Sequence, residues 1–283
     1  MVVSARPVSV VTGAGRGIGL AVVTQLSRLG HDVVMVVRDP ERAEGAVRGI
    51  RERGGRVTLV RGDLGSLRTT REVAKELAAC APRVDVLVHN AGVWPSRVER
   101  DEEGLERAFI VNHLAPFALN LLLEPLLAAS RTHVVQVSAG LYGLGRVDLA
   151  KTPYGDDFHP VRTYATTKLL NLFCMPRFAK RWAGLGPRID AVHPGVIRTG
   201  LGDRPGVLGG LLRVVKWAWQ EPAAGARPVV RLATDTNASS GRYFDVDVEK
   251  PLLPVARDEA LATAVWNQAA SLARLEEEAT RAA

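Results

Sequence analysis

Four short apolar runs alternate with helical segments in the first ninety residues, and this rhythm limits the fold more than any other feature. The runs are Val8–Val11, Val33–Val37, Val57–Val60 and Val84–Val88. They are rich in β-branched residues and lack the alternation of a strand with one face in water, which is typical of parallel strands buried on both faces. Helical periodicity fills the segments between them, over Gly17–Leu29, Glu41–Arg53 and Ser66–Ala79. The pattern predicts an α/β fold with helices on both faces of the sheet.

The second half of the chain continues this pattern less regularly. A helix over Leu105–Ala129 contains Pro116 and Pro125, so we expect it to kink or break. Further strands are predicted at Val134–Val137, Ile189–Val192 and Arg242–Val246, and further helices from Tyr164 to Trp182, over Ala223–Ala233 and over Asp258–Arg281. The segment from Gly140 to Val161 is irregular. Without a repeat, linker or change of composition, one domain over residues 1–283 is the simplest prediction.

A glycine-rich segment joins the first strand to the first helix, and it indicates a phosphate site. It reads Thr12-Gly-Ala-Gly-Arg-Gly-Ile-Gly19. Glycines allow a tight turn and a close approach of the backbone to a pyrophosphate, while the helix N-terminus offers free N–H groups. The strand–turn–helix context distinguishes it from an ordinary glycine-rich turn. A single-domain, Rossmann-type, doubly wound sheet that binds a dinucleotide is therefore predicted.

The end of the second strand indicates which dinucleotide is bound. Arg38 is the first residue after this strand, and Arg16 lies inside the glycine segment. An arginine here would accept the 2′-phosphate of NADP, whereas an acidic residue would bind the ribose of NAD. Asp39 is interpreted as a helix cap followed by Pro40 at the first helical position. The sequence favours NADP(H), and NAD(H) is the less favoured alternative.

Tyr164 and Lys168 lie four residues apart on a predicted helix, so they share one face. A nearby ammonium favours the phenolate and is expected to lower the pKa of the tyrosine. Such a pair could exchange a proton with a carbonyl or alcohol oxygen. The alternative is a chance pair on an amphipathic helix, and only the other motifs favour the catalytic interpretation.

The charge and the cysteines suggest no further chemistry. The net charge is +7 and the pI about 9.8, but the arginines are scattered, which favours a solvated surface over a nucleic-acid partner. Cys80 and Cys174 form no metal-ligand pattern, so no metal is expected, and both are predicted to be buried free thiols. The chain shows neither a signal peptide nor a run of ~18 apolar residues, so a cytoplasmic location without a transmembrane segment is expected.

Taken together, these motifs resemble the short-chain dehydrogenase/reductase family over nearly the whole chain. The resemblance implies that Gly13, Gly17, Ile18 and Gly19 bind the cofactor phosphates, and the family's other cofactor motifs are matched by Asp63-Leu64, Asn90-Ala91-Gly92 and Pro194-Gly195 with Val196 and Thr199. It implies catalytic roles for Tyr164 and Lys168, which also bind the cofactor, and for Asn112, which would organise a relay water. Segments such as Val111–Phe117 and His193–Gly195 look like the retinol-dehydrogenase-like or carbonyl-reductase-like branch, which handles bulky apolar carbonyls or alcohols.

The chain departs from the family pattern near the fifth strand. Where the family usually reads Ser-Ser, this chain reads Ser138-Ala139, so the catalytic position falls on Ala139 without a gap. Ser138 could still reach the substrate after a local shift, or it could simply end the strand. A hydroxyl on the substrate could supply the missing hydrogen bond. From Ser138 to Tyr164 there are 26 residues, about twice the family's usual gap, so Gly145–Val161 is interpreted as an insertion.

A substrate lid is expected after the sixth strand, over about residues 199–220, where glycines would allow hinge motion. Its apolar residues, and Trp94 after the Asn-Ala-Gly motif, indicate a bulky lipophilic or aromatic substrate, such as a polyketide, steroid or retinoid ketone. Core packing or a membrane-surface patch would explain the same residues. We expect NADPH-dependent reduction of a ketone or aldehyde, or the reverse oxidation, by a monomer or homodimer. A noncatalytic NADP(H)-binding regulator is the alternative, supported only by Ala139.

Overall fold

The architecture is a parallel β-sheet covered by helices on both faces, in a computed structural model that describes residues 6–195 and 221–273. Within these residues the sheet has eight strands in the order β3-β2-β1-β4-β5-β6-β7-β8. They are β1 (Val8–Thr12), β2 (Asp32–Val37), β3 (Arg56–Arg61), β4 (Val86–His89), β5 (His133–Val137), β6 (Arg188–His193), β7 (Tyr243–Asp245) and β8 (Val248–Glu249). Only β8 pairs antiparallel with its neighbour. This confirms the predicted Rossmann-type sheet, in which the strand order reverses beside β1 and leaves a crevice for ligands at the carboxyl edge.

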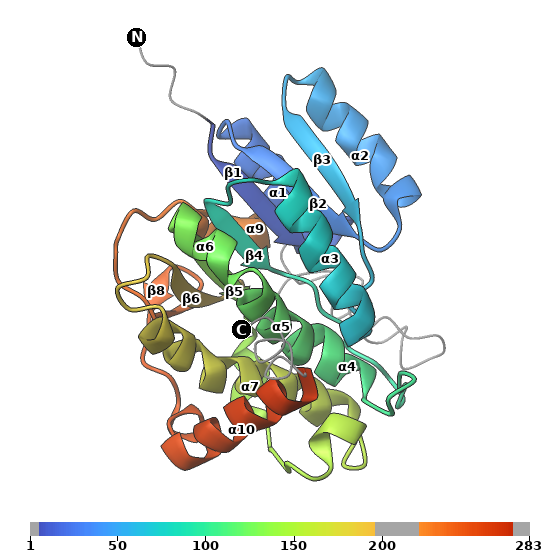
Figure 1. Cartoon of the computed structure of the whole chain (residues 1–283), viewed down its shortest axis with the longest axis vertical. Helices are drawn as coiled ribbons and strands as arrows, with labels where there is room; N and C mark the ends of the chain where they lie inside the picture. Colours follow the sequence, from blue (N-terminus) through green and yellow to red (C-terminus); the bar gives the residue numbers. More distant parts are fainter. Residues whose placement is uncertain (1–5, 196–220, 274–283) are drawn as a thin grey trace, which may run out of the picture.

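The helices form two layers, and each buries its own hydrophobic cluster against the sheet. They are α1 (Gly17–Arg28), α2 (Pro40–Glu52), α3 (Leu67–Cys80), α4 (Arg107–Phe109), α5 (Ala115–Leu122), α6 (Glu124–Ser130), α7 (Pro160–Arg181), α9 (Pro222–Ala233) and α10 (Glu259–Ala273). One cluster holds side chains of α3, α5, α7 and α10, and α3, α5 and α7 lie toward the viewer in Figure 1. The other cluster holds side chains of α1, α2 and α9. Strands sealed on both sides explain why their sequences are continuously apolar.

Helix caps follow the sequence signals closely. Asp39 accepts a hydrogen bond from the Arg42 N–H at 3.4 Å, with Pro40 at the start of α2, as predicted. Ser66 accepts from the Thr69 N–H at 3.2 Å and begins α3. These caps matter for function because both helices begin at the carboxyl edge of the sheet.

The long helix predicted over Leu105–Ala129 is broken, as its prolines suggested. A π-helical turn over Ile110–Leu114 separates α4 from α5. A second break at Leu123 separates α5 from α6. Pro116 and Pro125 each lie at the start of the next helix, where a missing N–H costs little. The π-helical turn matters because Asn112 lies within it.

Several expectations need correction or lie outside the described residues. Cys80 is exposed, because it ends α3 beside solvent, and only Cys174 is buried as predicted. The fourth strand begins at Val86 rather than Val84, whose N–H donates to Ser130 Oγ at 3.1 Å. The short β8 was not predicted. The predicted lid, with Val196 and Thr199, and the end of the last helix fall on residues that are not described.

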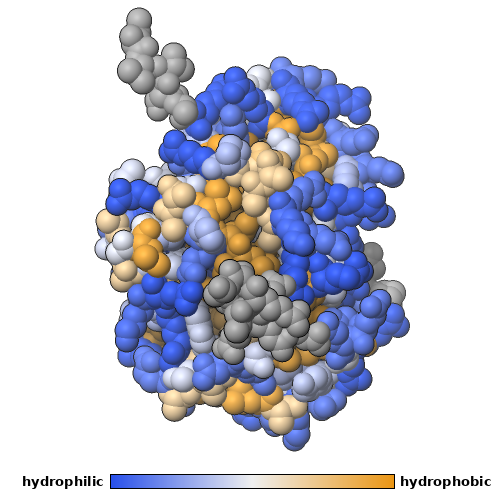
Figure 2. All heavy atoms as spheres, viewed as in Figure 1, coloured by the Kyte–Doolittle hydropathy of each residue, from blue (hydrophilic) through white to orange (hydrophobic). Residues whose placement is uncertain are grey.

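Helices α2 and α3 turn polar faces outward, and hydrophilic side chains cover them in Figure 2. Along the described residues, no single helix has the length and apolarity to cross a membrane. One bent pair, Arg107–Leu122 with Glu124–Ser130, meets both requirements jointly with a bend of 65°. Most side chains of Arg107–Leu122 are buried in the core of the protein, which explains their apolar character.

Candidate active site

The glycine segment and the first turn of α1 border a cavity of about 680 Å³ at the carboxyl edge of the sheet. Gly13 and Gly17 have φ values of +63° and +58°, which other L-residues rarely adopt. A Cβ on Gly19 would lie 2.4 Å from both the Gly13 carbonyl oxygen and Asn90 Nδ2, so no larger residue fits. The loop and the helix therefore pack as closely as a pyrophosphate site requires.

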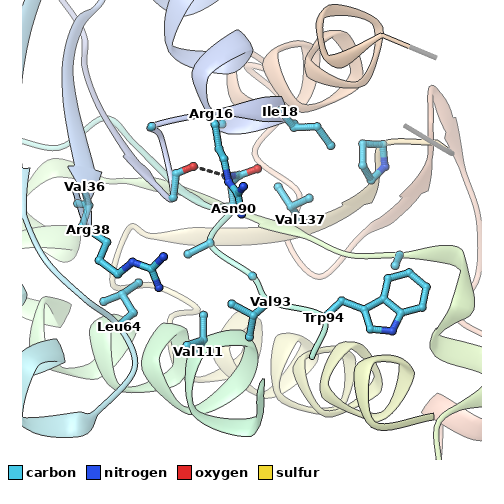
Figure 3. A pocket seen from close by; sticks show the side chains of 18 of the residues that line it. Arg16, Ile18, Val36, Arg38, Leu64, Asn90, Val93, Trp94, Val111 and Val137 are labelled. Atoms are coloured by element: carbon cyan, nitrogen blue, oxygen red, sulfur yellow. Dashed lines mark hydrogen bonds between the residues drawn. The ribbon is translucent and has the colours of Figure 1, made fainter. Parts of the chain in front are cut away.

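The floor of the cavity is held together by Asn90 and Thr12. Asn90, labelled in Figure 3, donates from its Nδ2 to the carbonyl oxygens of Thr12 at 3.0 Å and Gly13 at 3.2 Å. Thr12 Oγ1 accepts from the N–H groups of Asn90 and Ala91, both at 3.1 Å. The predicted Asn90-Ala91-Gly92 motif thus lines the cavity and fixes the glycine loop, and Thr12 is a further organising residue that the sequence did not single out as such.

One end of the cavity gathers arginines beside apolar side chains. Figure 3 places Arg38 next to Leu64, and Arg16 also reaches the cavity from the glycine segment. Arg42 was missed from the sequence: it lines the same end, and its Nε lies 2.8 Å from Asp39 Oδ2. Its position three residues after the Asp39 cap was the signal, because that spacing brings the two side chains together on a helix.

Asp63 and Leu64, which are predicted to bind the cofactor, also line the cavity. Asp63 Oδ1 accepts a hydrogen bond from the Gly65 N–H at 3.0 Å, which fixes the carboxylate at the end of β3. Leu64 is buried and Val111, on the π-helical turn, lines the cavity too. A carboxylate between apolar walls suits a flat heterocycle that carries an amino group, so this end fits the adenosine half of a dinucleotide.

Tyr164 and Lys168 lie together in the cavity wall, both almost completely buried, at 7% and 3% exposure. Lys168 Nζ is 5.7 Å from the centroid of the Tyr164 ring and donates to the Val137 carbonyl oxygen at 2.9 Å. The tyrosine ring stacks on Trp94, with centroids 4.5 Å apart and planes 7° from parallel. The predicted pair is therefore brought into one site.

The expected lowering of the tyrosine pKa is wrong for this structure. Burial raises the pKa of Tyr164 above its ordinary value, and burial lowers the pKa of Lys168 to about 8. Taking either charge out of water outweighs the attraction of the ammonium for a phenolate. At neutral pH Tyr164 is thus a protonated phenol that can donate its proton, beside a lysine that is still mostly protonated.

Asn112 connects the π-helical turn to the catalytic helix. Its Oδ1 accepts from the Val93 N–H at 2.7 Å, and its Nδ2 donates to the Val93 carbonyl oxygen at 2.9 Å and to Thr167 Oγ1 at 3.0 Å. The Asn112 main-chain carbonyl oxygen, in turn, accepts from Asn171 Nδ2 at 2.7 Å. A buried amide with its bonds satisfied fixes local geometry. Asn112 thus lies in a π-helical turn that departs from a regular α-helix, while the relay water stays a prediction.

Ser138 and Ala139 both line the cavity at the end of β5, but the serine hydroxyl is enclosed. Ser138 is 4% exposed, and its Oγ is buried without a hydrogen-bond partner among the described residues. Its main-chain N–H donates to the Val192 carbonyl oxygen at 2.8 Å, which continues the sheet. His193 lines the cavity nearby, and its imidazole lies against Gly140, where a Cβ would be 3.2 Å from Nε2. A catalytic role for Ser138 stays a prediction.

After β6, the structure describes the wall of the cavity as far as Gly195. Pro194 and Gly195 follow β6 and line the cavity, as predicted, and Gly195 has a φ of +90°. Over residues 6–195 and 221–273, no three His, Cys, Asp or Glu side chains gather as a metal site would need. The groups that converge on the cavity instead fit a dinucleotide along the glycine loop with a proton donor at one end.

Fold and cavity together define a class, the nicotinamide-dinucleotide-dependent oxidoreductases built on a Rossmann-type sheet. The chain belongs to the short chain dehydrogenase family, whose model matches residues 7–204. It is 35% identical to retinol dehydrogenase 14 of Mus musculus, over 91% of this chain and 83% of that protein. It is 33% identical to retinol dehydrogenase 13 of Homo sapiens, over 96% and 86%. It is therefore an NAD(P)-dependent short-chain oxidoreductase of the retinol-dehydrogenase-like branch.

Solved structures agree with this assignment. An uncharacterised protein from Mycobacterium paratuberculosis has a TM-score of 0.76 at 26% identity, and the match covers 95% of this chain and 94% of that one. A metagenomic short-chain oxidoreductase in complex with NADP has a TM-score of 0.64 at 26% identity, covering 87% and 98%. The family membership favours the enzyme over the alternative of a noncatalytic NADP(H)-binding regulator.

Proposed function

We propose that this protein uses NADPH to reduce a ketone or aldehyde on a bulky lipophilic or aromatic substrate, and catalyses the reverse alcohol oxidation when the cofactor ratio is reversed. The observation that carries the proposal is the pair Tyr164 and Lys168 in the wall of a cavity that Arg16, Arg38 and Arg42 also line, with Arg38 at the end away from Trp94. A phenol at one end supplies a proton, and the arginine cluster at the other supplies charge for an extra phosphate.

In this proposal each residue has a defined task. Bound NADPH supplies the hydride, and the protein controls orientation and proton transfer. Tyr164 donates its phenolic proton to the carbonyl oxygen of the substrate as that oxygen becomes an alkoxide. Lys168, held by the Val137 carbonyl oxygen at 2.9 Å, keeps a positive charge beside the phenol and binds the ribose next to the nicotinamide. Asn112 holds the loop after β4 through Val93.

The preference for NADPH rests on the balance of charge at the adenosine end. Asp39 is the acidic residue that would repel a 2′-phosphate, but its carboxylate is paired with Arg42 at 2.8 Å. Arg16 and Arg38 then remain to receive the phosphate. We expect Arg38→Ser to raise the KM for NADPH about 10- to 100-fold and leave the KM for NADH nearly unchanged, because one charge-assisted contact to the phosphate is lost. Steady-state kinetics with both cofactors measure this, and equal effects on the two would contradict the preference.

The choice of substrate class rests on the walls around Tyr164. Ile18, Val93, Trp94, Val137 and Leu141 line the cavity, so apolar and aromatic surface surrounds the proton donor. The names of the related retinol dehydrogenases point the same way. Polyketide-type, steroid and retinoid carbonyls are therefore the compounds to test, and a tailoring ketoreductase is one role that fits. A substrate with its own hydroxyl beside the carbonyl would supply the hydrogen bond that Ala139 does not offer.

The proposal is tested by following NADPH absorbance with a panel of bulky aromatic and polycyclic carbonyls, for the wild-type protein and Tyr164→Phe. We expect turnover by the wild type and a loss of about 10²- to 10⁴-fold in the variant, because only the proton donor is removed. Binding of NADPH should be retained in the variant, and this control separates loss of chemistry from loss of the site. Turnover that survives the substitution would contradict the assignment of Tyr164.

Three further properties are part of the proposal and await their own measurements. We propose a cytoplasmic location, a monomer or homodimer, and no binding to nucleic acid. Fractionation and light scattering measure the first two. DNA binding that weakens steeply with salt would contradict the third.

A further inference from the structure

Trp94 is attached to the helix that carries Tyr164 at two points. Its indole ring stacks on the Tyr164 ring at 4.5 Å, with the two planes 7° apart. Its Nε1 donates a 2.7 Å hydrogen bond to the carbonyl oxygen of Pro160, the first residue of α7. Since Tyr164 lies about one turn further along α7, the indole spans the first turn of the helix beside the tyrosine ring.

The backbone that carries Trp94 is also fixed. The preceding residue, Val93, exchanges two hydrogen bonds with the Asn112 side chain, at 2.7 and 2.9 Å. Asn112 is completely buried and is bonded to Thr167 of α7 as well. The loop after β4 that carries Trp94, the π-helical turn and α7 are therefore joined by polar bonds.

The stack is placed where it can affect chemistry. Trp94 is half-buried and lines the cavity, and Figure 3 shows it at the opposite end from Arg38. Stacked aromatic pairs at such distances attract each other beyond their buried area, which favours one ring orientation over its alternatives. A phenol that must aim its hydroxyl at one atom of the substrate gains from that restriction, because misplacement by ~1 Å can cost ~10²-fold in rate.

We propose that Trp94 is a positioning residue that holds the Tyr164 ring in its proton-donating orientation through this stack. The inference rests on the proposed reductase function and assigns that site a residue beyond the tyrosine, lysine, asparagine and serine. The ring contact carries the effect. The bond to Pro160 aligns the indole, and the stacked ring also shields the phenol from water.

Activity tests the proposal through a pair of substitutions. Trp94→Ala removes the stack, so we expect kcat to fall about 10- to 100-fold while the Kd for NADPH stays within about twofold. Trp94→Phe keeps a flat ring, so kcat should stay within about threefold of wild type. Trp94→Leu, which restores apolar volume without a ring, should resemble the alanine variant and replaces it if that variant does not fold. A kcat within threefold of wild type for Ala or Leu overturns the proposal, and so does a phenylalanine variant as slow as they are.

A second measurement needs no substrate. Burial raises the pKa of Tyr164, so removal of the indole should expose the ring and move this pKa down toward 10. Tyrosinate absorbance is titrated for each variant against the same variant with Tyr164→Phe, which isolates the signal of this tyrosine. A downward shift is expected for Ala and none for Phe, which keeps a ring over the phenol. An unchanged titration in Ala contradicts the shielding part of the proposal.

Trp266 provides a matched control, because it is also half-buried and packs on two rings, Phe117 at 5.0 Å and Phe178 at 4.6 Å. It does not line the cavity. Trp266→Ala should lower stability without changing the Tyr164 titration or kcat, so a purely structural effect is recognised. If the wild-type protein shows no turnover that depends on Tyr164, the proposed function fails, whereas the titration still decides whether Trp94 shields the tyrosine from water.

Discussion

In the part of the chain that the structure describes, buried ionisable groups are left unpaired at the carboxyl edge of the sheet and are paired with opposite charges toward its amino edge. At the carboxyl edge, Tyr164 and Lys168 are buried, and among the described residues no carboxylate pairs with the lysine. Toward the amino edge, Asp190 on β6 is completely buried, but His133 Nε2 lies 3.0 Å and the Arg242 guanidinium 2.7 Å from its Oδ2. Asp235 adds a second carboxylate to Arg242 at 3.0 Å.

The pKa values of Asp190 and Lys168 reflect this difference in pairing. Burial alone raises the pKa of Asp190, but hydrogen bonds from His133 and Arg242 more than offset this and the pKa ends below its ordinary value. For Lys168 burial is not offset, and the pKa falls to about 8. Buried charges that are fully paired support the fold, whereas a buried charge left unpaired destabilises it and is retained where chemistry needs it.

The largest effect is expected from breaking the paired cluster. Asp190→Asn should lower the free energy of unfolding by about 3 kcal/mol at pH 7, the lower end of the range for removing one member of a buried pair, since Arg242 keeps Asp235. Denaturation by urea measures this. Because the cluster lies away from the cavity, kcat of the folded variant should stay at the wild-type value.

Asp247→Asn is the matched control, since Asp247 pairs with Arg227 and Arg231 at the surface, where it is 39% exposed. Exposed pairs contribute about 0–1 kcal/mol, so this variant should be nearly as stable as wild type. Equal losses for the two aspartates would show that burial does not distinguish them. A large fall in kcat with unchanged stability in Asp190→Asn would show that the two edges are not independent.

The functional residues at the carboxyl edge of the sheet were predicted from the sequence far better than the buried cluster toward its amino edge. Strand periodicity, the glycine segment and the spacing of Tyr164 to Lys168 are local signals, so the sheet and most cavity residues were found. The Asp190 cluster joins residues of β5 and β6 to Asp235 and Arg242, which lie in the segment between α9 and β7, and nothing in their spacing indicates it. Arg42 was missed although its signal was local, because a charge on a helix is usually only solvated.

The direction predicted for the pKa of Tyr164 was also wrong. Spacing alone shows that an ammonium lies one turn from the phenol, which favours the phenolate. It does not show that both groups are nearly sealed from water, and this burial outweighs the attraction. Likewise, the apolar context of Cys80 indicated burial, yet the end of α3 leaves that residue exposed. Burial depends on contacts between distant segments and is not contained in local pattern.

At the carboxyl edge of the sheet, we expect a smaller change in the free energy of unfolding, and one of the opposite sign. Lys168→Met should abolish most activity, by about 10² or more in kcat, but raise the free energy of unfolding by on the order of 2 kcal/mol at pH 7. The gain arises because the buried ammonium is removed, and it is reduced by the lost hydrogen bond to the Val137 carbonyl oxygen. Urea denaturation and the NADPH assay on the same samples measure both quantities.

The pH dependence separates this explanation from better packing by methionine. With a pKa of about 8 in the folded protein and an ordinary value near 10.5 in the unfolded chain, Lys168 binds more protons when unfolded between these pH values. Wild-type stability from this group therefore rises with pH across that window, and the advantage of the methionine variant should shrink from pH 7 toward pH 10. Lys151→Met, at a lysine that is 59% exposed, should show neither the gain nor its decline. An advantage that stays constant with pH would mean that the unpaired charge is not what distinguishes the two edges of the sheet.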